Sequence, residues 1–560
     1  MKLDTRLRDI LALSALCVLF FILGNGVVPL TSPDEVFYAG TAREMAAHHT
    51  WFVPYLFDQP QFEKPILTFW LLRFAFAVLG VSSFAARLFP ALFATLGVLA
   101  TYLLVTVAGG SRFKAFLSAV ILMSALLYIG LARTVFTDMF FSVFMLLALV
   151  SFYWGYVAEG RTRGSAVILF FVFCAAAVLT KGPLGFALPM MAIVLFLALQ
   201  RNLAFLLSRH MLWGFLLGCL IALPWYLFML ATYGHGFTHE FFYNDHLRRV
   251  LEAEHRSVDR WYFYPGGILL SAFPWSVYAA AALVPFVARL RRWRENPFPV
   301  FLACWIVVVV GVFQCAHSKL LSYVFPVLPA LAVITADFIV DRAGPGRGRT
   351  LPVLSILTWL ALLAAVPGIG AALSHGFKHT PALSAMAMAV VPPAVTLCLM
   401  LFAIVRAQWR LMAGAMAAQV PALLATVFLW DPRVCDSMVN KTVSDYLMTI
   451  QGDTTNRVLC AKVVLRGVRY YTGYPVGVFD PGGENFFSPH PVPFVDSFDK
   501  MKQFLDTQPV TICVLRLGLP DELGSILGPG YRVDVLRRFE RVCVLRVSKE
   551  TASPPPAGGN

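Results

Sequence analysis

The sequence predicts an all-α polytopic membrane domain of about 13 transmembrane helices, followed by a small α/β domain outside the cytoplasm. The composition is the first reason, because 59% of the 560 residues are hydrophobic and only 14% are charged. A soluble protein averages about 45–50% apolar and about 25% charged residues. The second reason is that apolar runs of membrane-spanning length recur over residues 1–430. The third is a change to a polar, β-branched pattern in residues 431–550.

Each span is predicted from an apolar run of about 20 residues, the length that crosses the hydrocarbon core as a helix. The first run has no small-residue cleavage site, so we interpret it as an anchor and not as a removed signal peptide. Two connections are longer than a turn requires and form the predicted outer loops 31–83 and 232–265. The predicted spans are 9–30, 84–108, 114–132, 136–157, 164–180, 183–200, 211–231, 266–289, 298–316, 320–340, 351–373, 386–405 and 411–430.

Basic residues between the spans predict the orientation of the chain. Lys2, Arg6 and Arg8 precede the first span, and the alternate loops carry most of the remaining arginines. Positive residues are retained on the cytoplasmic side, so the N-terminus is expected in the cytoplasm and the C-terminal domain outside. The net charge of +14 follows from these short clusters and not from one basic face. A nucleic-acid partner is therefore not expected.

The predicted C-terminal domain, 431–550, contains β-rich runs at 457–464, 510–516 and 541–547. Helical patterns at 442–450 and 496–506 separate these runs. Residues 551–560 are rich in Pro, Gly and Ser and are predicted to be disordered. No cysteine spacing suggests zinc, and the four cysteines of this region leave a disulfide open.

Two acids, Asp34 and Glu35, follow the first span directly. Charges beside a membrane are costly unless they have a function, although a helix start at the water boundary would also account for them. Glu63 and Lys64 precede Pro65, which favours the start of an apolar helix. An ammonium at that position suits a phosphate. An ordinary solvated ion pair is the alternative for Glu63 and Lys64.

Further polar residues lie at the predicted outer ends of the spans, not in their middles. A pore or carrier would place charges near the bilayer midplane, so this distribution favours chemistry on the outer face. The residues are Arg133, Asp138, Lys181, His246, Arg248, Arg249, Lys319 and Tyr323.

This combination resembles the GT-C superfamily of polyprenyl-phosphate-dependent glycosyltransferases over essentially the whole chain. It is most similar to the bacterial branch of protein O-mannosyltransferase-like and 4-amino-4-deoxy-L-arabinose (lipid A) transferases. The motifs are Asp34-Glu35 with Tyr38, 42–45, 62–65, Arg87, 246–249, and 318–319 with Tyr323 and Pro326. The resemblance departs at Phe37, because aminoarabinose transferases typically carry arginine there.

The resemblance implies roles for individual residues. It places Asp34 as the catalytic carboxylate with Glu35 beside it, and Asp138 as the acid of the second outer loop. The predicted substrate-binding residues are Lys64 on the donor phosphate, Arg248 and Arg249 as helpers, and Lys319, Tyr323 and Tyr38 in the donor cavity. Glu63 and His246 match positions of a divalent metal site.

The function implied is transfer of a sugar, with inversion, from a polyprenyl-phosphate donor to an envelope acceptor. The acceptor would be lipid A, another glycolipid or a protein, reached on the periplasmic face of the bacterial inner membrane. The partners are therefore the lipid-linked donor, the acceptor and membrane lipids. The alternative is a transporter or flippase for a lipid-linked sugar, which predicts charged sites at mid-span and two related halves. The sequence shows neither feature.

Overall fold

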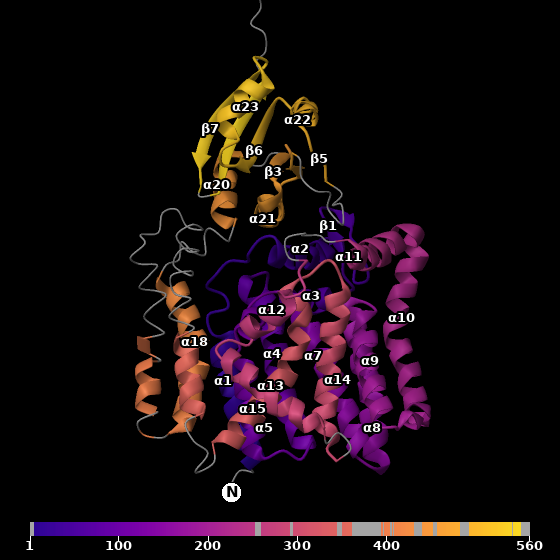
Figure 1. Ribbon diagram of the computed structural model, residues 1–560. Coiled ribbons are helices and arrows are strands. Elements are labelled where there is room, and N and C mark those ends of the chain that lie inside the picture. The colour runs from indigo at the N-terminus through magenta and orange to yellow at the C-terminus, as the bar shows by residue number, and fades with distance from the viewer. Residues whose placement is uncertain are drawn as a thin grey trace, which may run out of the picture.

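The computed structural model describes residues 5–252, 259–291, 295–343, 350–360, 394–395, 397–403, 406, 408–430, 440–451, 456–481, 492–539 and 541–549. The chain forms a bundle of helices with the C-terminal domain at one end and the N-terminus at the opposite end (Figure 1). The predicted disordered tail, 551–560, lies outside the described residues.

Within the described residues, six helices are long and apolar enough to cross a membrane, or up to eight if each bent pair is one span. The predicted runs 351–373 and 386–405 fall largely outside those residues, and 183–200 corresponds to the short α9 (Leu184–Leu199). The six are α4 (Ser83–Val107), α7 (Thr137–Val157), α8 (Gly160–Lys181), α14 (Pro297–Cys315), the segment Arg209–Leu251 and the segment Leu321–Arg342.

Two predicted spans are bent. α5 (Arg112–Met123) meets α6 (Leu126–Ala132) at 67°, and α12 (Phe263–Ser271) meets α13 (Ser276–Leu290) at 116°. The two bends contact each other, because the backbone N–H of Leu126 donates to the carbonyl of Phe273 at 2.8 Å. The Trp275 indole also donates to the Ser124 hydroxyl at 2.9 Å. Backbone groups released by one bend are therefore satisfied at the other.

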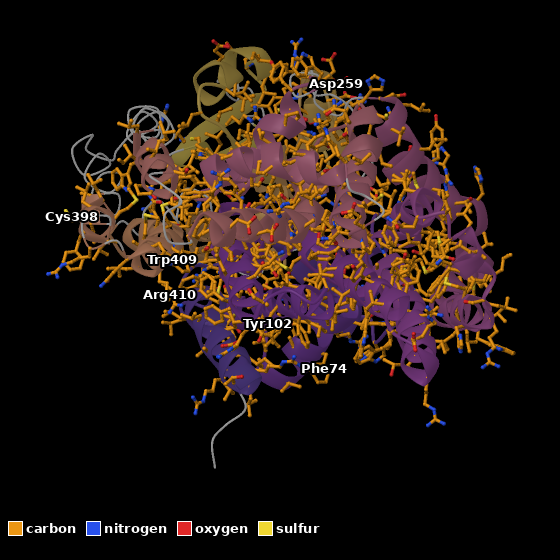
Figure 2. All side chains as sticks on the ribbon, turned by 60° about the horizontal axis from the view of Figure 1, so that its bottom comes forward. Phe74, Tyr102, Asp259, Cys398, Trp409 and Arg410 are labelled. Carbon is orange, nitrogen blue, oxygen red and sulfur yellow. The ribbon has the colours of Figure 1, made fainter. Side chains whose placement is uncertain are left out.

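The first predicted span begins as α1 (Thr5–Cys17) and continues as the π-helix η1 (Val18–Ile22). α18 (Trp409–Trp430) lies at the edge of the bundle. There the Trp409 ring meets the Phe113 ring edge-on at 4.9 Å. The Arg410 guanidinium lies over the same phenyl ring at 5.4 Å, and Figure 2 shows Trp409 and Arg410 beside each other.

The predicted outer loop 232–265 is helical for much of its length. α10 (Arg209–Thr238) kinks at Gly234, where φ is 51°, and continues as the π-helix η3 (His239–Leu247) and α11 (Arg248–Leu251). Large apolar side chains such as Leu220 and Leu227 remain exposed along α10. This is the surface that a helix offers to lipid.

The first outer loop folds against the end of the bundle. Its helix α2 (Asp34–Ala47) is largely buried and is followed by the short hairpin β1 (Tyr55–Leu56) and β2 (Gln59–Pro60). α3 (Leu67–Leu79) starts two residues after Pro65, as the sequence predicts. Leu321–Val327 (η5) is a 3-10 turn that leads into α15 (Leu328–Arg342) and faces α12.

The C-terminal domain contains a six-stranded sheet in the order β5-β4-β3-β6-β8-β7. β3 pairs in parallel with β4 and β6, whereas β8 is antiparallel to both β6 and β7. The thiols of Cys460, Cys513 and Cys543 are buried, and no disulfide joins these three. The strands are β3 (Val458–Ala461), β4 (Val476–Phe479), β5 (Phe494–Val495), β6 (Val510–Arg516), β7 (Tyr531–Arg538) and β8 (Val542–Lys549).

The helices of this domain are α20 (Lys441–Gln451), α21 (Lys462–Thr472), α22 (Phe498–Leu505) and α23 (Pro520–Leu527). The predicted strand 457–464 is therefore too long, because the chain turns into α21 at Lys462. Val464, Leu465 and Val468 form the buried face of that helix, and the Val-Val-Leu run had the composition of a strand.

One hydrophobic core joins the first outer loop to the C-terminal domain. Val36 and Phe37 of α2 belong to the same cluster of buried side chains as Val464 and Val468 of α21. The domain therefore packs directly on the loop that carries Asp34, and Figure 1 shows α21 above α2.

Candidate active site

Polar side chains converge where the bundle meets the C-terminal domain. They come from the start of α2, the segment between β2 and α3, the first turn of α7, the last turn of α8, η3 and η5. Local chemistry explains several of these positions. Asp138 is in the first turn of α7, where the helix dipole favours an acid, and Lys181 is in the last turn of α8, where it favours a base.

The π-helix η3 contributes a buried carboxylate that two cations share. The Lys64 ammonium lies 2.6 Å from the Asp245 carboxylate, and the side chain of Asp245 is only 5% exposed. Arg249, one helical turn further on, lies 3.1 Å from the same carboxylate. The Arg249 guanidinium also donates to the Tyr323 hydroxyl at 3.4 Å.

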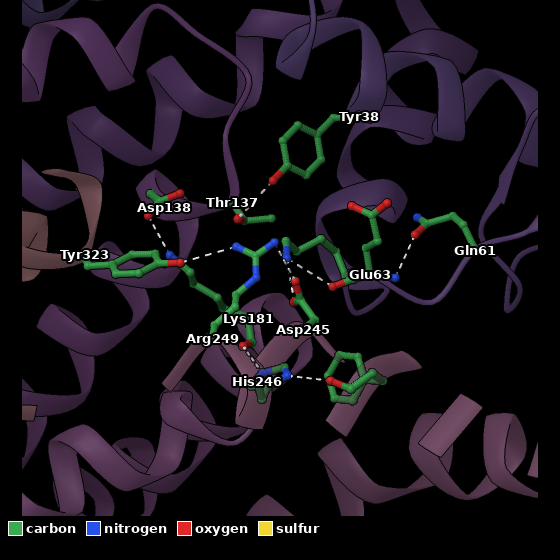
Figure 3. A network of polar contacts seen from close by, with 12 residues as sticks. Tyr38, Gln61, Glu63, Thr137, Asp138, Lys181, Asp245, His246, Arg249 and Tyr323 are labelled. Carbon is green, nitrogen blue, oxygen red and sulfur yellow. Dashed lines mark hydrogen bonds and ion pairs between the residues drawn. The ribbon is translucent and has the colours of Figure 1, made fainter. Parts of the chain in front are cut away.

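A second ion pair lies next to Tyr323. The Lys181 ammonium donates to the Asp138 carboxylate at 2.6 Å, and the Asp138 side chain is 8% exposed. The same ammonium lies 4.9 Å from the centre of the Tyr323 ring. Tyr323 thus contacts a cation from each pair, as Figure 3 shows.

These residues form a positively biased cluster, which we call the cation cluster: Lys64, Lys181 and Arg249 with Asp138 and Asp245. Three positive side chains share two carboxylates, so these five residues carry one net positive charge. Arginine and lysine at close quarters are the usual protein ligands of a phosphate. The cluster is therefore suited to a phosphate monoester or diester.

Asp34 differs from every other acid in the site. Its side chain is exposed, and none of the described residues forms a hydrogen bond or ion pair with it. Desolvation by the surrounding protein raises the pKa of Asp34, the positive charge of Arg466 lowers it, and the negative charges of Asp138 and Glu63 raise it further. A solvent-accessible carboxylate with a raised pKa is suited to proton transfer or to stabilising a developing positive charge.

Glu35, the other acid predicted to be catalytic, is fully buried and occupied. Its carboxylate accepts from both Nε and Nη2 of Arg87, at 2.8 and 2.6 Å. It also accepts from the backbone N–H groups of Thr31 and Val135, at 2.9 and 3.1 Å. The carboxylate therefore joins the first outer loop to α4 and to the start of α7.

Glu63 and His246, predicted as metal ligands, do not fit a metal ion here. The Glu63 carboxylate lies 3.9 Å from the Arg466 guanidinium. The ring nitrogens of His246 face backbone carbonyls, Nδ1 that of Phe241 at 2.7 Å and Nε2 that of Lys181 at 3.4 Å. No group of three or more His, Cys, Asp or Glu side chains that could hold a metal occurs in the described part of the chain.

The remaining predicted residues are dispersed. Arg248 pairs with Glu252 at 2.9 Å. Lys319 is buried and binds Asp259 and the carbonyl of Ala316. The Tyr38 hydroxyl lies 3.3 Å from that of Thr137, next to Asp138, and Figure 3 shows it directed toward the cluster.

Sequence reasoning assigned no role to Asp245, Lys181 or Arg466. For Asp245, the available signal is its spacing of four residues from Arg249, because residues four apart face each other on a helix. Lys181 stands at a break between two apolar runs, before Gly182 and Pro183. No signal in the sequence places Arg466 at the site.

Comparison with known proteins identifies relatives of this chain. A family model described as dolichyl-phosphate-mannose-protein mannosyltransferase matches residues 7–239. An undecaprenyl phosphate-α-4-amino-4-deoxy-L-arabinose arabinosyl transferase of Erwinia tasmaniensis is 30% identical over 378 residues, which cover 67% of this chain and 67% of that protein. Its counterpart in Yersinia pestis (strain Pestoides F) is 31% identical over 374 residues, or 64% of this chain and 65% of that protein.

Solved structures match over nearly the whole chain. ArnT from Cupriavidus metallidurans bound to undecaprenyl phosphate has a TM-score of 0.78 at 21% identity, covering 96% of this chain and 97% of that one. The Archaeoglobus fulgidus oligosaccharyltransferase in its apo form has a TM-score of 0.56 at 13% identity, covering 94% and 71%. These likenesses confirm the expected architecture of a helical membrane domain with a smaller C-terminal domain.

Proposed function

This chain belongs to the family of the undecaprenyl phosphate-α-4-amino-4-deoxy-L-arabinose arabinosyl transferases, and from that premise we propose that it moves 4-amino-4-deoxy-L-arabinose from undecaprenyl phosphate to lipid A. It is a multi-pass membrane glycosyltransferase of the GT-C type that uses a polyprenyl-phosphate sugar. Phe37, which stands where aminoarabinose transferases typically carry arginine, is therefore a variation within this family.

The cation cluster carries the proposal. In the transfer, an acceptor oxygen forms a bond to the anomeric carbon while the bond from that carbon to the phosphate oxygen breaks. The electron pair stays on the phosphate, so undecaprenyl phosphate gains one negative charge as it leaves. Lys64, Lys181 and Arg249 are positioned to stabilise that charge, and fixed charges at a leaving group lower the barrier without rearrangement.

Asp34 is the carboxylate proposed to act on the acceptor side. If the acceptor group is a hydroxyl, Asp34 takes its proton as the new bond forms. If the group is a phosphate, no proton has to be removed, and Asp34 stabilises the positive charge that develops on the sugar. Attack from the side opposite the departing phosphate inverts the anomeric carbon. Both roles require the ionised form of Asp34.

The site is proposed to face the periplasm of a bacterial cell, with the N-terminus in the cytoplasm. The opposite placement of the N-terminus and the C-terminal domain (Figure 1) supports this orientation. The basic residues near the N-terminus support it as well, because positive residues are retained on the cytoplasmic side.

The test compares wild type with Asp34→Asn, using radiolabelled undecaprenyl phosphate-aminoarabinose and lipid A, other envelope glycolipids or envelope proteins as acceptors. We expect wild type to label lipid A, and Asp34→Asn to lose at least about 100-fold in rate while it still binds undecaprenyl phosphate. Asp534→Asn, the same change on β7 of the C-terminal domain, is the matched control. Labelling of another acceptor would replace lipid A, and lipid movement across vesicles without transfer would favour the transporter.

A further inference from the structure

Helix α21 of the C-terminal domain packs on the segment that leads into Asp34. The Ser32 hydroxyl donates to the backbone carbonyl of Val463 at 3.3 Å. The Tyr471 hydroxyl donates to the backbone carbonyl of Leu30 at 2.8 Å. α21 therefore holds the chain immediately before Asp34 at two points.

The other end of α2 is held by the same helix. Arg469 of α21 lies 3.2 Å from the Glu44 carboxylate and 2.6 Å from that of Asp58. In the reverse direction, the Arg43 guanidinium donates to the backbone carbonyl of Tyr470 at 2.6 Å. With contacts at both ends of α2, the position of α21 relative to Asp34 is fixed.

Arg466 lies between these two sets of contacts and faces the site. The carbon of its guanidinium is 4.6 Å from the centre of the Phe37 ring, and one of its nitrogens is 3.9 Å from the Glu63 carboxylate. Its side chain is 17% exposed. A guanidinium held on an aromatic face keeps its charge and its orientation.

We propose that Arg466 is a positioning residue of the transfer reaction, and that the C-terminal domain is thereby a working part of the active site. α21 delivers its guanidinium to the Phe37 ring beside Glu63, where its positive charge stabilises the Asp34 carboxylate. The inference rests on the proposed function, because it assumes that ionised Asp34 performs the chemistry.

Four charged groups face Asp34 from the elements packed around it. Glu35 belongs to α2, Glu63 to the segment before α3 and Asp138 to α7, and all three are negative. Arg466 of α21 is positive, and its charge lowers the pKa of Asp34. Desolvation and the three acids raise that pKa. Without Arg466, the carboxylate would be protonated at a higher pH.

The experiment measures transfer against pH for wild type, Arg466→Gln and Arg466→Lys in the full-length protein. Arg532→Gln, the same change at an exposed position of β7, is the matched control. In Arg466→Gln we expect the acidic limb of the pH–rate profile to move to higher pH, so that the loss of rate is larger at low pH. Arg466→Lys should restore the wild-type limb, and Arg532→Gln should not change it.

A second measurement does not depend on activity. A carbodiimide activates protonated carboxyl groups, and an added amine then forms an amide that mass spectrometry locates. The midpoint of Asp34 labelling should move to higher pH in Arg466→Gln and stay at the wild-type value in Arg532→Gln. If Arg466→Gln does not fold, Arg466→Met keeps the packing on Phe37 and removes the charge.

The outcomes separate the two claims. A shifted labelling midpoint without transfer by wild type would support the effect of Arg466 on the Asp34 carboxylate and overturn the proposed function. An unshifted midpoint, with or without a uniform loss of rate, would reduce Arg466 to a structural contact and overturn the inference.

Discussion

Lys181 and Asp138 form an ion pair of 2.6 Å between the end of α8 and the start of α7. α7 and α8 are consecutive and antiparallel, so a base at the end of one is brought to an acid at the start of the other. Both charges lie at the end of the bundle that meets the C-terminal domain, and both contribute to the cation cluster. The pair therefore anchors Lys181 at the site, and the Lys181 ammonium also lies over the Tyr323 ring.

The adjacent acids Asp34 and Glu35 should behave in opposite ways when neutralised. Glu35→Gln disrupts the buried pair with Arg87 and should lower the free energy of unfolding by about 3–5 kcal/mol. Asp34→Asn should abolish transfer but keep or raise the melting temperature, because a raised pKa means that ionised Asp34 destabilises the fold at neutral pH. Thermal unfolding in detergent measures the stability of both variants, and a transfer assay measures their activity. A stable but inactive Glu35→Gln would return Glu35 to the chemistry.

The adjacent arginines Arg248 and Arg249 offer a matched pair for donor binding. Arg249→Gln removes a cation from the cluster and should weaken the binding of undecaprenyl phosphate by about 10- to 100-fold. Arg248→Gln removes a pair with the exposed Glu252 carboxylate, outside the cation cluster, and should leave the dissociation constant within about 2-fold. Titration of the purified variants with undecaprenyl phosphate measures both. Equal losses would mean that binding depends on net charge alone.

Gly182 follows Lys181 at a φ of +86°, and a Cβ at this position would come within 2.6 Å of the His246 ring. Gly182→Ala should therefore displace His246 and Lys181 and reduce transfer by at least about 10-fold, as misplaced catalytic groups do. Gly109, at a φ of +74° with nothing within 4 Å, is the control. Gly109→Ala has similar backbone strain, and its rate should remain near that of wild type. A normal rate for Gly182→Ala would show that the loop adapts.

The pH dependence of transfer should report Asp34. Desolvation and neighbouring acids raise the pKa of this carboxyl. The midpoint of the acidic limb of the pH–rate profile should therefore lie above the usual pKa range of an aspartate. Activity should fall as the pH falls through that pKa. Glu63→Gln removes a like charge and should move the limb to lower pH. A limb that does not respond to Glu63→Gln would belong to another group.

Much of the site could be predicted from the sequence because its signals are local. The helix start that was the alternative explanation for Asp34 is present, because Asp34 is the first residue of α2. Lys64 was predicted at the mouth of an apolar helix and lies just before α3. Such signals depend on neighbouring residues, so they do not reveal partners that are distant in the sequence. Asp245 binds Lys64 from η3, and that pairing depends on how the helices pack.

Arg466 could not be predicted for a physical reason. The run around Val463 and Val464 has strand composition, and only packing on α2 selects the helix. Phe37 was noted for the arginine it replaces in the family pattern. The structure places an arginine on that ring, but from near the other end of the chain.

The shared core of α2 and α21 also has a consequence for how the protein is made. α2 leaves the ribosome early and enters the membrane with the first spans, whereas α21 is synthesised near the end of the chain. Val36 and Phe37 cannot complete their packing until that late segment has been synthesised and has folded. The segment that carries Asp34 therefore stays incompletely packed until the end of synthesis, and a chain truncated before α21 is expected to insert its helices without completing this core.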